Sequence, residues 1–291
     1  MLIHNINEIK KPKNVVILGA NGFIGKSLSI KLESEGISVK KLSRKDIDLL
    51  DRNASESLAT LLTKDDVLVA TSAIAPCNNP DMLKDNIKIA IAICKAAYNA
   101  GCCHVINISS DAVYADVDDL INENTTKSPD SFHGVMHLAR EIIFNNQITE
   151  ALTTVRPTLI YGEGDTHNGY GPNQFSRLAK ENLPIKLFGK GEERRDHVYI
   201  KDIVEVIYRI IQRRSSGVIN IASGDVRSFL EIAEKVSEFS ENTINIHFRD
   251  RIGPMPHNGY RPFDISAYKE LFPDFSFTPF EVGIKETLEK I

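Results

Sequence analysis

The sequence predicts an α/β protein built on a Rossmann-type, doubly wound parallel sheet with a smaller C-terminal substrate-binding lobe. Two observations lead to this prediction. Short apolar runs alternate along the chain with segments of helical periodicity, and the first run ends in a turn with three evenly spaced glycines. Strands and helices that alternate at this pitch are typical of a parallel sheet with right-handed crossovers.

Apolar runs bounded by glycine, proline or polar residues predict the strands, and apolar residues at helical spacing predict the helices. The predicted strands span residues 15–18, 37–42, 67–70, 104–108, 152–155, 185–188 and 218–221. The predicted helices span residues 26–35, 55–62, 86–100, 134–146, 174–181, 203–212 and 229–239. Gly36 and Gly101 stand where two of these helices should end, since glycine readily adopts the left-handed conformation found there.

The sequence changes in character after Pro157. Glycines between residues 162 and 171 predict a long functional loop, and the elements that follow are smaller. We expect a dinucleotide-binding domain over residues 1–165, with a return segment near 196–223, and a substrate-binding lobe over residues 166–291. The lobe should close over the carboxyl edge of the sheet, where ligands of such sheets bind.

Composition and charge exclude several classes of protein. With 291 residues, 42% of them hydrophobic and 25% charged, the chain is typical of a globular protein. No apolar run approaches the roughly 20 residues that cross a bilayer, and a net charge of −4 gives no basic field for nucleic acid. The four cysteines lack zinc-type spacing, and no apolar block follows the N-terminal lysines. We therefore expect a cytoplasmic protein with no bound metal and no membrane or nucleic-acid partner.

The glycine turn predicts where a dinucleotide binds. Gly19, Gly22 and Gly25 follow a buried strand and open a helix, so the backbone can approach a pyrophosphate closely. The alternative is a plain strand–helix turn. The residues predicted to contact the cofactor are Gly19, Asn21, Gly22, Phe23, Ile24, Gly25, Ser43, Arg44, Asp48, Leu49 and Ala70.

The end of the second strand indicates which dinucleotide is preferred. It reads Leu42-Ser43-Arg44-Lys45, with no carboxylate at the tip to bind the ribose hydroxyls of NAD. A basic residue there accommodates the 2′-phosphate of NADP, so NADP is favoured over NAD. The alternative is that both basic residues are solvated loop charges. Asp48 and Leu49 could meet the adenine amino group.

Three further segments carry a family resemblance. They read Ser109-Ser110-Asp111-Ala112-Val113-Tyr114, Val155-Arg156-Pro157-Thr158-Leu159-Ile160-Tyr161-Gly162 and Arg194-Arg195-Asp196-His197-Val198-Tyr199. Together with the glycine turn and Asn86, they resemble the extended short-chain dehydrogenases/reductases, in the branch of nucleotide-sugar epimerases, dehydratases and 4-ketoreductases. The resemblance spans nearly the whole chain. It implies hydride exchange between NADP or NAD and a sugar carbon of a nucleotide-diphosphate sugar, and a homodimer.

The catalytic set of that family is a Ser or Thr, a Tyr, and a Lys four residues after the Tyr. The resemblance places Ser110 at the first position, where its hydroxyl would polarise a sugar oxygen. Asp111 matches an aspartate of the dehydratases and rhamnose-type reductases, and Tyr114 is expected to contact the substrate. Ala112 stands where dehydratases carry a Glu, which disfavours simple 4,6-dehydration.

The Tyr and Lys positions depart from the family. The usual Tyr-Gly-x-Ser-Lys-Leu-x-x-Glu here reads His133-Gly134-Val135-Met136-His137-Leu138-Ala139-Arg140-Glu141. An imidazole at residue 133 can exchange a proton near neutral pH, and His137 can donate to the nicotinamide ribose. Two imidazolium ions one helical turn apart would repel, so at most one is expected to be charged at pH 7.

Three alternatives to histidine catalysis stay open. The pair could bind a metal, since histidines four residues apart share a helix face. The pair could be inert in a catalytically silent nucleotide-binding or regulatory subunit. Or His137 could contact only the ribose while Tyr114, His167 or Tyr170 moves protons.

The resemblance also assigns residues to the sugar nucleotide. Arg195 matches an arginine that holds the substrate diphosphate, and Arg261 resembles a second one. A guanidinium suits this task because it forms paired hydrogen bonds to phosphate oxygens. Asn173 lies in a loop that shapes the sugar pocket in similar proteins. The alternative for Arg195 is an ion pair with a neighbouring Glu.

Overall fold

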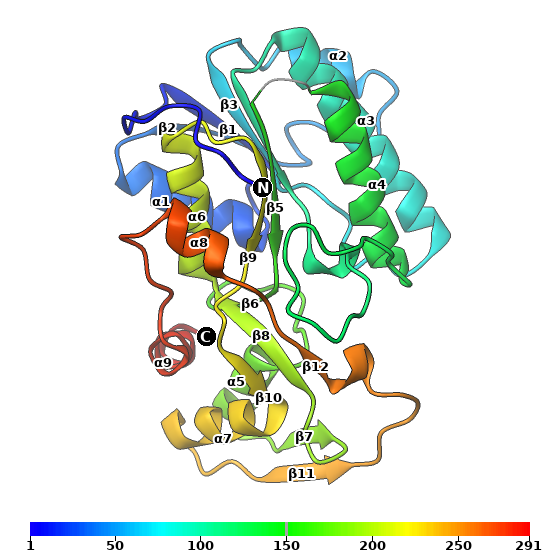
Figure 1. Cartoon of the computed structure of the whole chain (residues 1–291), viewed down its shortest axis with the longest axis vertical. Coiled ribbons are helices and arrows are strands. Elements are labelled where there is room, and N and C mark those ends of the chain that lie inside the picture. The colour runs from blue at the N-terminus through cyan, green and yellow to red at the C-terminus, as the bar shows by residue number, and fades with distance from the viewer. Residues whose placement is uncertain (149–150) are drawn as a thin grey trace. The chain divides into compact units, whose positions relative to one another are not determined.

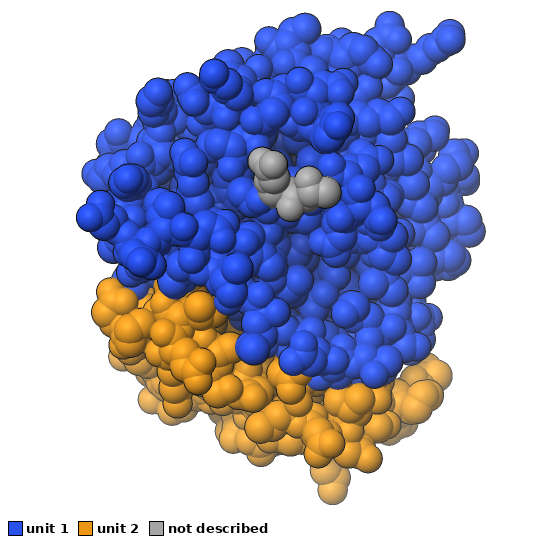
Figure 2. Space-filling model, turned by 45° about the horizontal axis from the view of Figure 1, so that its top comes forward, with its two compact units in different colours: residues 1–115, 123–157, 203–221 blue, residues 116–122, 158–202, 222–291 orange. Residues whose placement is uncertain are grey.

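A computed structural model of the protein describes residues 1–148 and 151–291, and it confirms the predicted α/β class. The chain forms two compact units, each made of three stretches of sequence (Figure 2). The first unit contains residues 1–115, 123–157 and 203–221, and the second contains residues 116–122, 158–202 and 222–291. The expected bounds of a cofactor lobe and a substrate lobe stay a prediction, because compactness does not say what a unit binds.

The first unit is built on a parallel sheet of six strands in the order β2-β1-β3-β4-β5-β9. The strands are β1 (Asn14–Leu18), β2 (Ser38–Leu42), β3 (Asp66–Ala70), β4 (His104–Ile108), β5 (Leu152–Pro157) and β9 (Gly217–Ile221). The chain winds outward from β1 in both directions, to β2 on one side and to β3 on the other. Ligands of doubly wound sheets bind at the carboxyl ends of the strands where the order reverses.

Helices cover both faces of this sheet (Figure 1). One layer contains α1 (Phe23–Ser34) and α6 (Ile200–Gln212), which are joined by an ion pair of 2.8 Å between Lys31 and Glu205. The other layer contains α2 (Ala54–Ala59), α3 (Pro80–Ala100) and α4 (Phe132–Gln147). Because both faces are covered, β3 and β4 are buried along their whole length, which explains their continuous apolar sequences.

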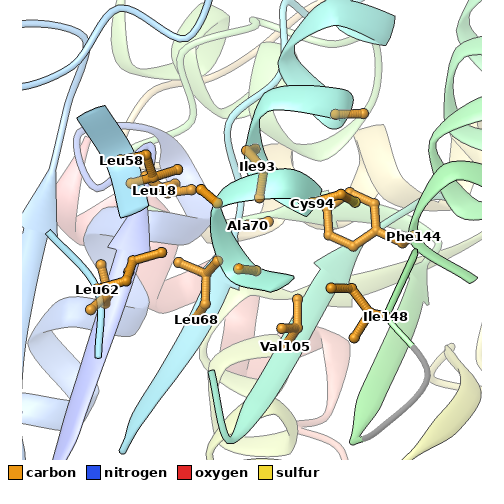
Figure 3. Close-up of a cluster of buried hydrophobic side chains, with 14 of the residues drawn as sticks. Leu18, Leu58, Leu62, Leu68, Ala70, Ile93, Cys94, Val105, Phe144 and Ile148 are labelled. Atoms are coloured by element: carbon orange, nitrogen blue, oxygen red, sulfur yellow. The ribbon is translucent and has the colours of Figure 1, made fainter. Parts of the chain in front are cut away.

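The core between the sheet and α2, α3 and α4 is a cluster of buried aliphatic side chains with Phe144 and Cys94 (Figure 3). Its members include Leu18, Leu58, Leu68, Ile93, Val105 and Phe144. Burying one such side chain stabilises the fold by roughly 1.5–3 kcal/mol. This packing fixes the carboxyl ends of the strands on which the site is built.

The helix α3 begins six residues before the predicted start at residue 86. Asn79 caps it by accepting a hydrogen bond from the N–H of Met82, and Pro80 follows at the first helical position. Both features are typical of helix starts, and they extend the helix over a stretch with few apolar residues. Gly101 ends the helix with a φ of 65°, as predicted.

The second unit contains short strands and helices. Its strands are β6 (Leu159–Tyr161), β7 (Ile185–Phe188), β8 (Arg194–Tyr199), β10 (Val226–Ser228), β11 (Ile246–Arg249) and β12 (Tyr260–Arg261). Its helices are α5 (Pro172–Lys180), α7 (Phe229–Phe239), α8 (Ser266–Leu271) and α9 (Phe280–Lys290). Of these, the sequence predicted β7, α5 and α7. In the described part of the chain, no helix is both long and apolar enough to span a membrane.

Candidate dinucleotide and two-histidine site

The glycine turn after β1 has the tight geometry of a phosphate-binding turn. Gly19 has a φ of 81°, which residues with a side chain rarely adopt. A Cβ atom at Gly25 would lie 2.3 Å from the carbonyl oxygen of Gly19. Any side chain at Gly25 would therefore push the start of α1 away from the turn.

The start of α1 offers backbone donors instead of a side-chain cap. Gly22 is its N-cap and makes no side-chain cap hydrogen bond, and the first turn of the helix contains no acidic residue. Asn79 and Ser131, by contrast, cap α3 and α4 through their side chains. Uncapped N–H groups and the positive end of the helix dipole favour an anion such as a pyrophosphate.

A cavity of about 280 Å³ opens beside this turn in the first unit. Six residues predicted to contact the cofactor line it, namely Gly19, Gly22, Ser43, Arg44, Asp48 and Leu49. The other five, Asn21, Phe23, Ile24, Gly25 and Ala70, are not part of the lining and stay predictions. The turn, the helix start and this cavity fit the phosphates and adenosine of a dinucleotide.

The two charged side chains of the cavity bind each other. The Nε and Nη2 atoms of Arg44 donate to Oδ2 of Asp48 at 3.1 and 3.0 Å, and the arginine side chain is 78% exposed. The hydrogen bond from the N–H of Leu50, followed by that from Arg44, lowers the pKa of Asp48. Arg44 is thus an exposed side chain whose charge is partly neutralised by Asp48, and its contact with a 2′-phosphate stays a prediction.

One wall of the cavity was not predicted from the sequence. Residues 71–74 of the loop between β3 and α3 line it. Thr71 donates to the carbonyl oxygen of Leu18 at 2.6 Å, and the side-chain amide of Asn86 exchanges two hydrogen bonds with the backbone of Ile74. Asn86, noted only as part of the resemblance, therefore fixes this wall.

The two histidines lie one turn apart on α4 with their rings in contact. The ring centroids are 4.7 Å apart and the ring planes are nearly perpendicular, at 89°. His133 is partly buried, and its Nδ1 accepts a hydrogen bond of 3.4 Å from the backbone N–H of Cys77. While that bond is formed, the exchangeable proton of the neutral ring is on Nε2.

His137 lies deeper than His133. It is buried, and its Nδ1 has no hydrogen-bond partner among the described residues. Burial lowers its pKa well below the ordinary histidine range, and the neighbouring His133 and Arg140 act in the same direction. The expectation that at most one ring is charged at pH 7 agrees with this, because His137 is neutral there.

The segment with Ser110 packs directly on the start of α4. The hydroxyl of Ser110 caps the short helical turn η1 (Asp111–Val113) and donates to Asp111 at 3.3 Å. A Cβ atom at Gly134 would lie 2.2 Å from the carbonyl oxygen of Ala112. The structure thus brings three predicted catalytic residues, Ser110, Asp111 and His133, onto two elements that touch.

Two residues predicted to bind substrate have other hydrogen-bond partners. The hydroxyl of Tyr114 is buried, donates to Asn220 at 2.6 Å and accepts from Arg156 at 2.7 Å. Burial raises its pKa to about 12, so this phenol is a poor candidate for proton transfer. The side-chain amide of Asn173 bonds the backbone at Gly162 and Ile160. Their contacts with substrate stay predictions.

The two arginines assigned to the diphosphate lie in the second unit, each next to a carboxylate. Arg195 is 3.5 Å from Glu193, so the predicted alternative of an ion pair with a neighbouring Glu is present. Arg251, which the sequence analysis did not single out, lies 3.3 Å from the same carboxylate. Arg261 is buried and donates to Asp116 at 2.6 Å. These contacts hold the arginines in place and leave their diphosphate role a prediction.

No group of three or more metal-binding side chains occurs among residues 1–148 and 151–291.

The other proposed proton carriers are Tyr170 and His167. The hydroxyl of Tyr170 accepts a hydrogen bond from the backbone N–H of Phe188, and burial raises the pKa of this phenol. His167 belongs to the loop held by Asp165, which accepts from its backbone N–H. Both residues belong to the second unit.

Comparison with known proteins gives consistent matches. Residues 15–222 match the NAD dependent epimerase/dehydratase family. The chain is 26% identical over 284 residues to an uncharacterized UDP-glucose epimerase of Bacillus subtilis, covering 92% of this chain and 87% of the relative. It is 24% identical over 274 residues to the dTDP-4-dehydro-6-deoxyglucose reductase of Escherichia coli, covering 83% and 86%.

A solved structure of UDP-glucose 4-epimerase from Thermotoga maritima with UDP-glucose has the same fold. It superposes with a TM-score of 0.84 at 20% identity, covering 95% of this chain and 98% of the other. At this identity the likeness shows the fold alone. Together with the six-stranded sheet, it supports the predicted Rossmann-type architecture.

Proposed function

Because this chain belongs to the NAD dependent epimerase/dehydratase family, we propose that it modifies the sugar of a nucleotide-diphosphate sugar by hydride transfer, as an epimerase or a 4-ketoreductase. This membership confirms the family that the sequence resembled, and with it the expectation that the protein is an NAD(P)-dependent enzyme. The observation that carries the proposal is the pair His133 and His137 on α4, packed against the turn that follows Ser110, in the same unit as the dinucleotide cavity.

Each residue of the site has a proposed role. A bound nicotinamide dinucleotide would supply or accept the hydride at the sugar carbon. The hydroxyl of Ser110 polarises the sugar oxygen, and the imidazolium of His133 gives its Nε2 proton to that oxygen, or the neutral ring takes the proton back at Nε2 in the reverse direction. In both forms Nδ1 carries a proton, so the 3.4 Å hydrogen bond from the N–H of Cys77 has to be released during the transfer. His137, neutral and buried, serves as a hydrogen-bonding partner of the ribose rather than as a cation.

The proposal is tested by incubating the protein with NADPH and a panel of nucleotide-linked keto-sugars while following nicotinamide absorbance. Oxidation of NADPH with at least one of them is the expected result. Tight binding of both ligands with no turnover, and with no epimer in the mixture, would instead favour a silent nucleotide-binding subunit.

We expect NADP(H) to bind more tightly than NAD(H), because Arg44 can leave Asp48 for a 2′-phosphate. Replacing Arg44 by Ala should narrow the affinity ratio by about tenfold, equivalent to ~1.4 kcal/mol. Calorimetry with both dinucleotides gives the ratio, and the control is Lys84→Ala, which removes an exposed cation of α3 that does not line the cavity. Equal affinities in the wild type would remove the basis for the NADP preference.

A nucleoside diphosphate sugar should raise the melting temperature, because ligands that bind only the folded state stabilise it by mass action, by ~2.7 kcal/mol at a hundredfold excess over Kd. Arg195→Ala should remove most of this shift. Arg194→Ala is the control, because the neighbouring side chain on β8 points to the opposite face of the strand and is exposed. If the ligand still raises the melting temperature of the Arg195→Ala variant, Arg195 does not bind the diphosphate and its role is the ion pair with Glu193.

The expected homodimer is also a proposal. Apolar side chains of α4 at helical spacing are exposed, among them Phe132 at 43%, Val135 at 38% and Ile142 at 54%. A row of this kind on one helix face is typical of a surface that another chain covers. Sedimentation of the wild type and of Ile142→Glu distinguishes the dimer from a monomer.

A further inference from the structure

Arg140 is a buried cation whose hydrogen bonds all go to neutral oxygens. It is 2% exposed on α4. Its Nε donates to the side-chain oxygen of Asn107 at 2.6 Å, and its two terminal nitrogens donate to the carbonyl oxygens of Ser72 and Ala70 at 2.8 and 2.9 Å. Among the described residues it has no carboxylate partner. Burial lowers its pKa to about 10, so the guanidinium stays charged at neutral pH.

The acceptors of Arg140 lie where β3 meets the dinucleotide cavity. Ala70 is the last residue of β3, and Ser72 lines the cavity. The same loop continues to Cys77, whose N–H donates to His133. One side chain therefore ties α4 to the cavity wall, and the wall in turn bonds one of the two histidines.

Arg140 also lies one helical turn after His137. The groups that lower the pKa of His137, after burial itself, are His133 and Arg140. Titratable groups on the elements packed against α4 include Asp111 in η1, which Ser110 bonds, Arg156 in β5 and Cys94 in α3. Burial raises the pKa of the Cys94 thiol to about 12, so it carries no charge at neutral pH.

The nearest carboxylate on α4 itself is engaged elsewhere. Glu141 receives two hydrogen bonds from Arg156 of β5 and one from the hydroxyl of Ser109. The positive charge of Arg140 is thus balanced only by carbonyl and amide oxygens and by the face of the Phe144 ring, 5.2 Å away. A second positive charge on this stretch of α4 would be repelled strongly by Arg140, because little water screens charges in the buried interior.

We propose that Arg140 is a positioning residue that clamps the β3 end of the dinucleotide cavity and supplies the fixed positive charge of the two-histidine site. This inference deepens the proposed function and rests on it for the roles of the cavity and the histidines. It explains why a histidine can stand where similar proteins have a lysine. The cation that the lysine would provide is already present, one turn further along α4.

The proposal predicts that a tyrosine and a lysine cannot simply be restored at residues 133 and 137. In the double variant His133→Tyr/His137→Lys, the new ammonium would lie one turn from Arg140. We expect this variant to unfold at a lower urea concentration than the wild type. Arg140→Met should lower the urea midpoint of the wild type, because it leaves three buried acceptors unpaired, but it should lower that of the double variant less, because there it also removes the repulsion.

The direct test is the titration of His137 in the ligand-free protein, followed by NMR of labelled histidine, in Arg140→Met, Arg140→Gln and Arg140→Lys. Both neutral variants should raise the pKa of His137, although burial continues to hold it below the ordinary histidine range, and the lysine variant should leave it near the wild-type position. Lys95→Met, which removes an exposed cation of α3, should also leave it unchanged. The glutamine variant is also uncharged but keeps an N–H donor. It replaces the methionine variant in the titration if that variant does not fold.

Dinucleotide affinity tests the clamp separately. Arg140→Lys keeps the charge but cannot reach all three acceptors, so we expect its Kd for NADPH to rise about tenfold, and that of Lys95→Met not to change. An unchanged titration of His137 in both neutral variants, or an unchanged Kd in Arg140→Lys, overturns the proposal. Neither readout needs a sugar substrate. If no sugar substrate is turned over but the pKa of His137 still rises in the neutral Arg140 variants, the proposed reaction is refuted while the proposed role of Arg140 is supported.

Discussion

Replacing His133 by phenylalanine is expected to lower reductive turnover by a factor of about 10²–10⁴, the usual size of a general acid–base contribution. The ring of His133 is the only proton-exchanging side chain proposed here for the sugar oxygen, and phenylalanine keeps its approximate size. Rates with NADPH and a keto-sugar nucleotide measure the effect. Calorimetry of both ligands should show affinities within a few-fold of the wild type, so that the loss lies in kcat.

The pH profile separates proton transfer from hydrogen bonding alone. If an imidazolium donates the proton, reductive turnover falls as pH rises through the range where histidines titrate, whereas a phenol would remain a donor to higher pH. His133→Phe should lose this limb. His133→Gln is the matched control, because an amide can donate a hydrogen bond but cannot carry the proton. Wild-type rates and an unchanged profile in the phenylalanine variant would show that His133 is not the acid.

Breaking the ion pair between Arg156 and Glu141 is expected to destabilise the fold by about 3–5 kcal/mol. The two side chains are 2% and 3% exposed and share two hydrogen bonds, of 2.8 and 2.6 Å. Arg156→Met leaves the buried carboxylate of Glu141 without its cation, and Glu141→Gln leaves the buried guanidinium of Arg156 without its anion. The free energy of unfolding in urea measures the loss.

An exposed pair provides the control for this prediction. Lys41 and Glu33 approach to 2.8 Å, but their side chains are 47% and 46% exposed, so Glu33→Gln should cost less than about 1 kcal/mol. The double variant Arg156→Met/Glu141→Gln should lose less than the sum of its two single changes, because neither charge is then left alone. Equal losses of unfolding free energy for the buried pair and the exposed pair would contradict the prediction that the buried pair stabilises the fold more. Because Ser109 bonds Glu141 next to Ser110, the buried change should also reduce activity.

The sequence predicted the sheet of the first unit well because most of its strands are buried on both faces and read as apolar runs, β2 at the edge being the exception. Strand β4 was predicted at its observed bounds, His104–Ile108. The strand β8 was missed as a strand, although its residues carried the resemblance, because Arg194 and Arg195 begin it and break the apolar pattern. Short polar strands are held by their neighbours rather than by their own composition.

The candidate site was predicted in the same uneven way. The glycine turn, the end of β2 and the two histidines follow from local patterns, and the structure brings several of them to one cavity or one helix face. The wall at residues 71–74 and the clamp by Arg140 depend on contacts between elements far apart in sequence. One observation could have revealed Arg140, since it occupies the same helix face as His133, His137 and Phe144, where an apolar residue is expected.

Gly134 bears on how this site could have changed during evolution. The distance between α4 and the turn at Ala112 is set by a glycine that has no room for a side chain, and not by the residue at 133. The side chain before it can therefore be exchanged by mutation while the helix keeps its place beside Ser110. A lineage can thus replace the side chain at residue 133 by a single substitution without changing how the start of α4 packs against the turn at Ala112.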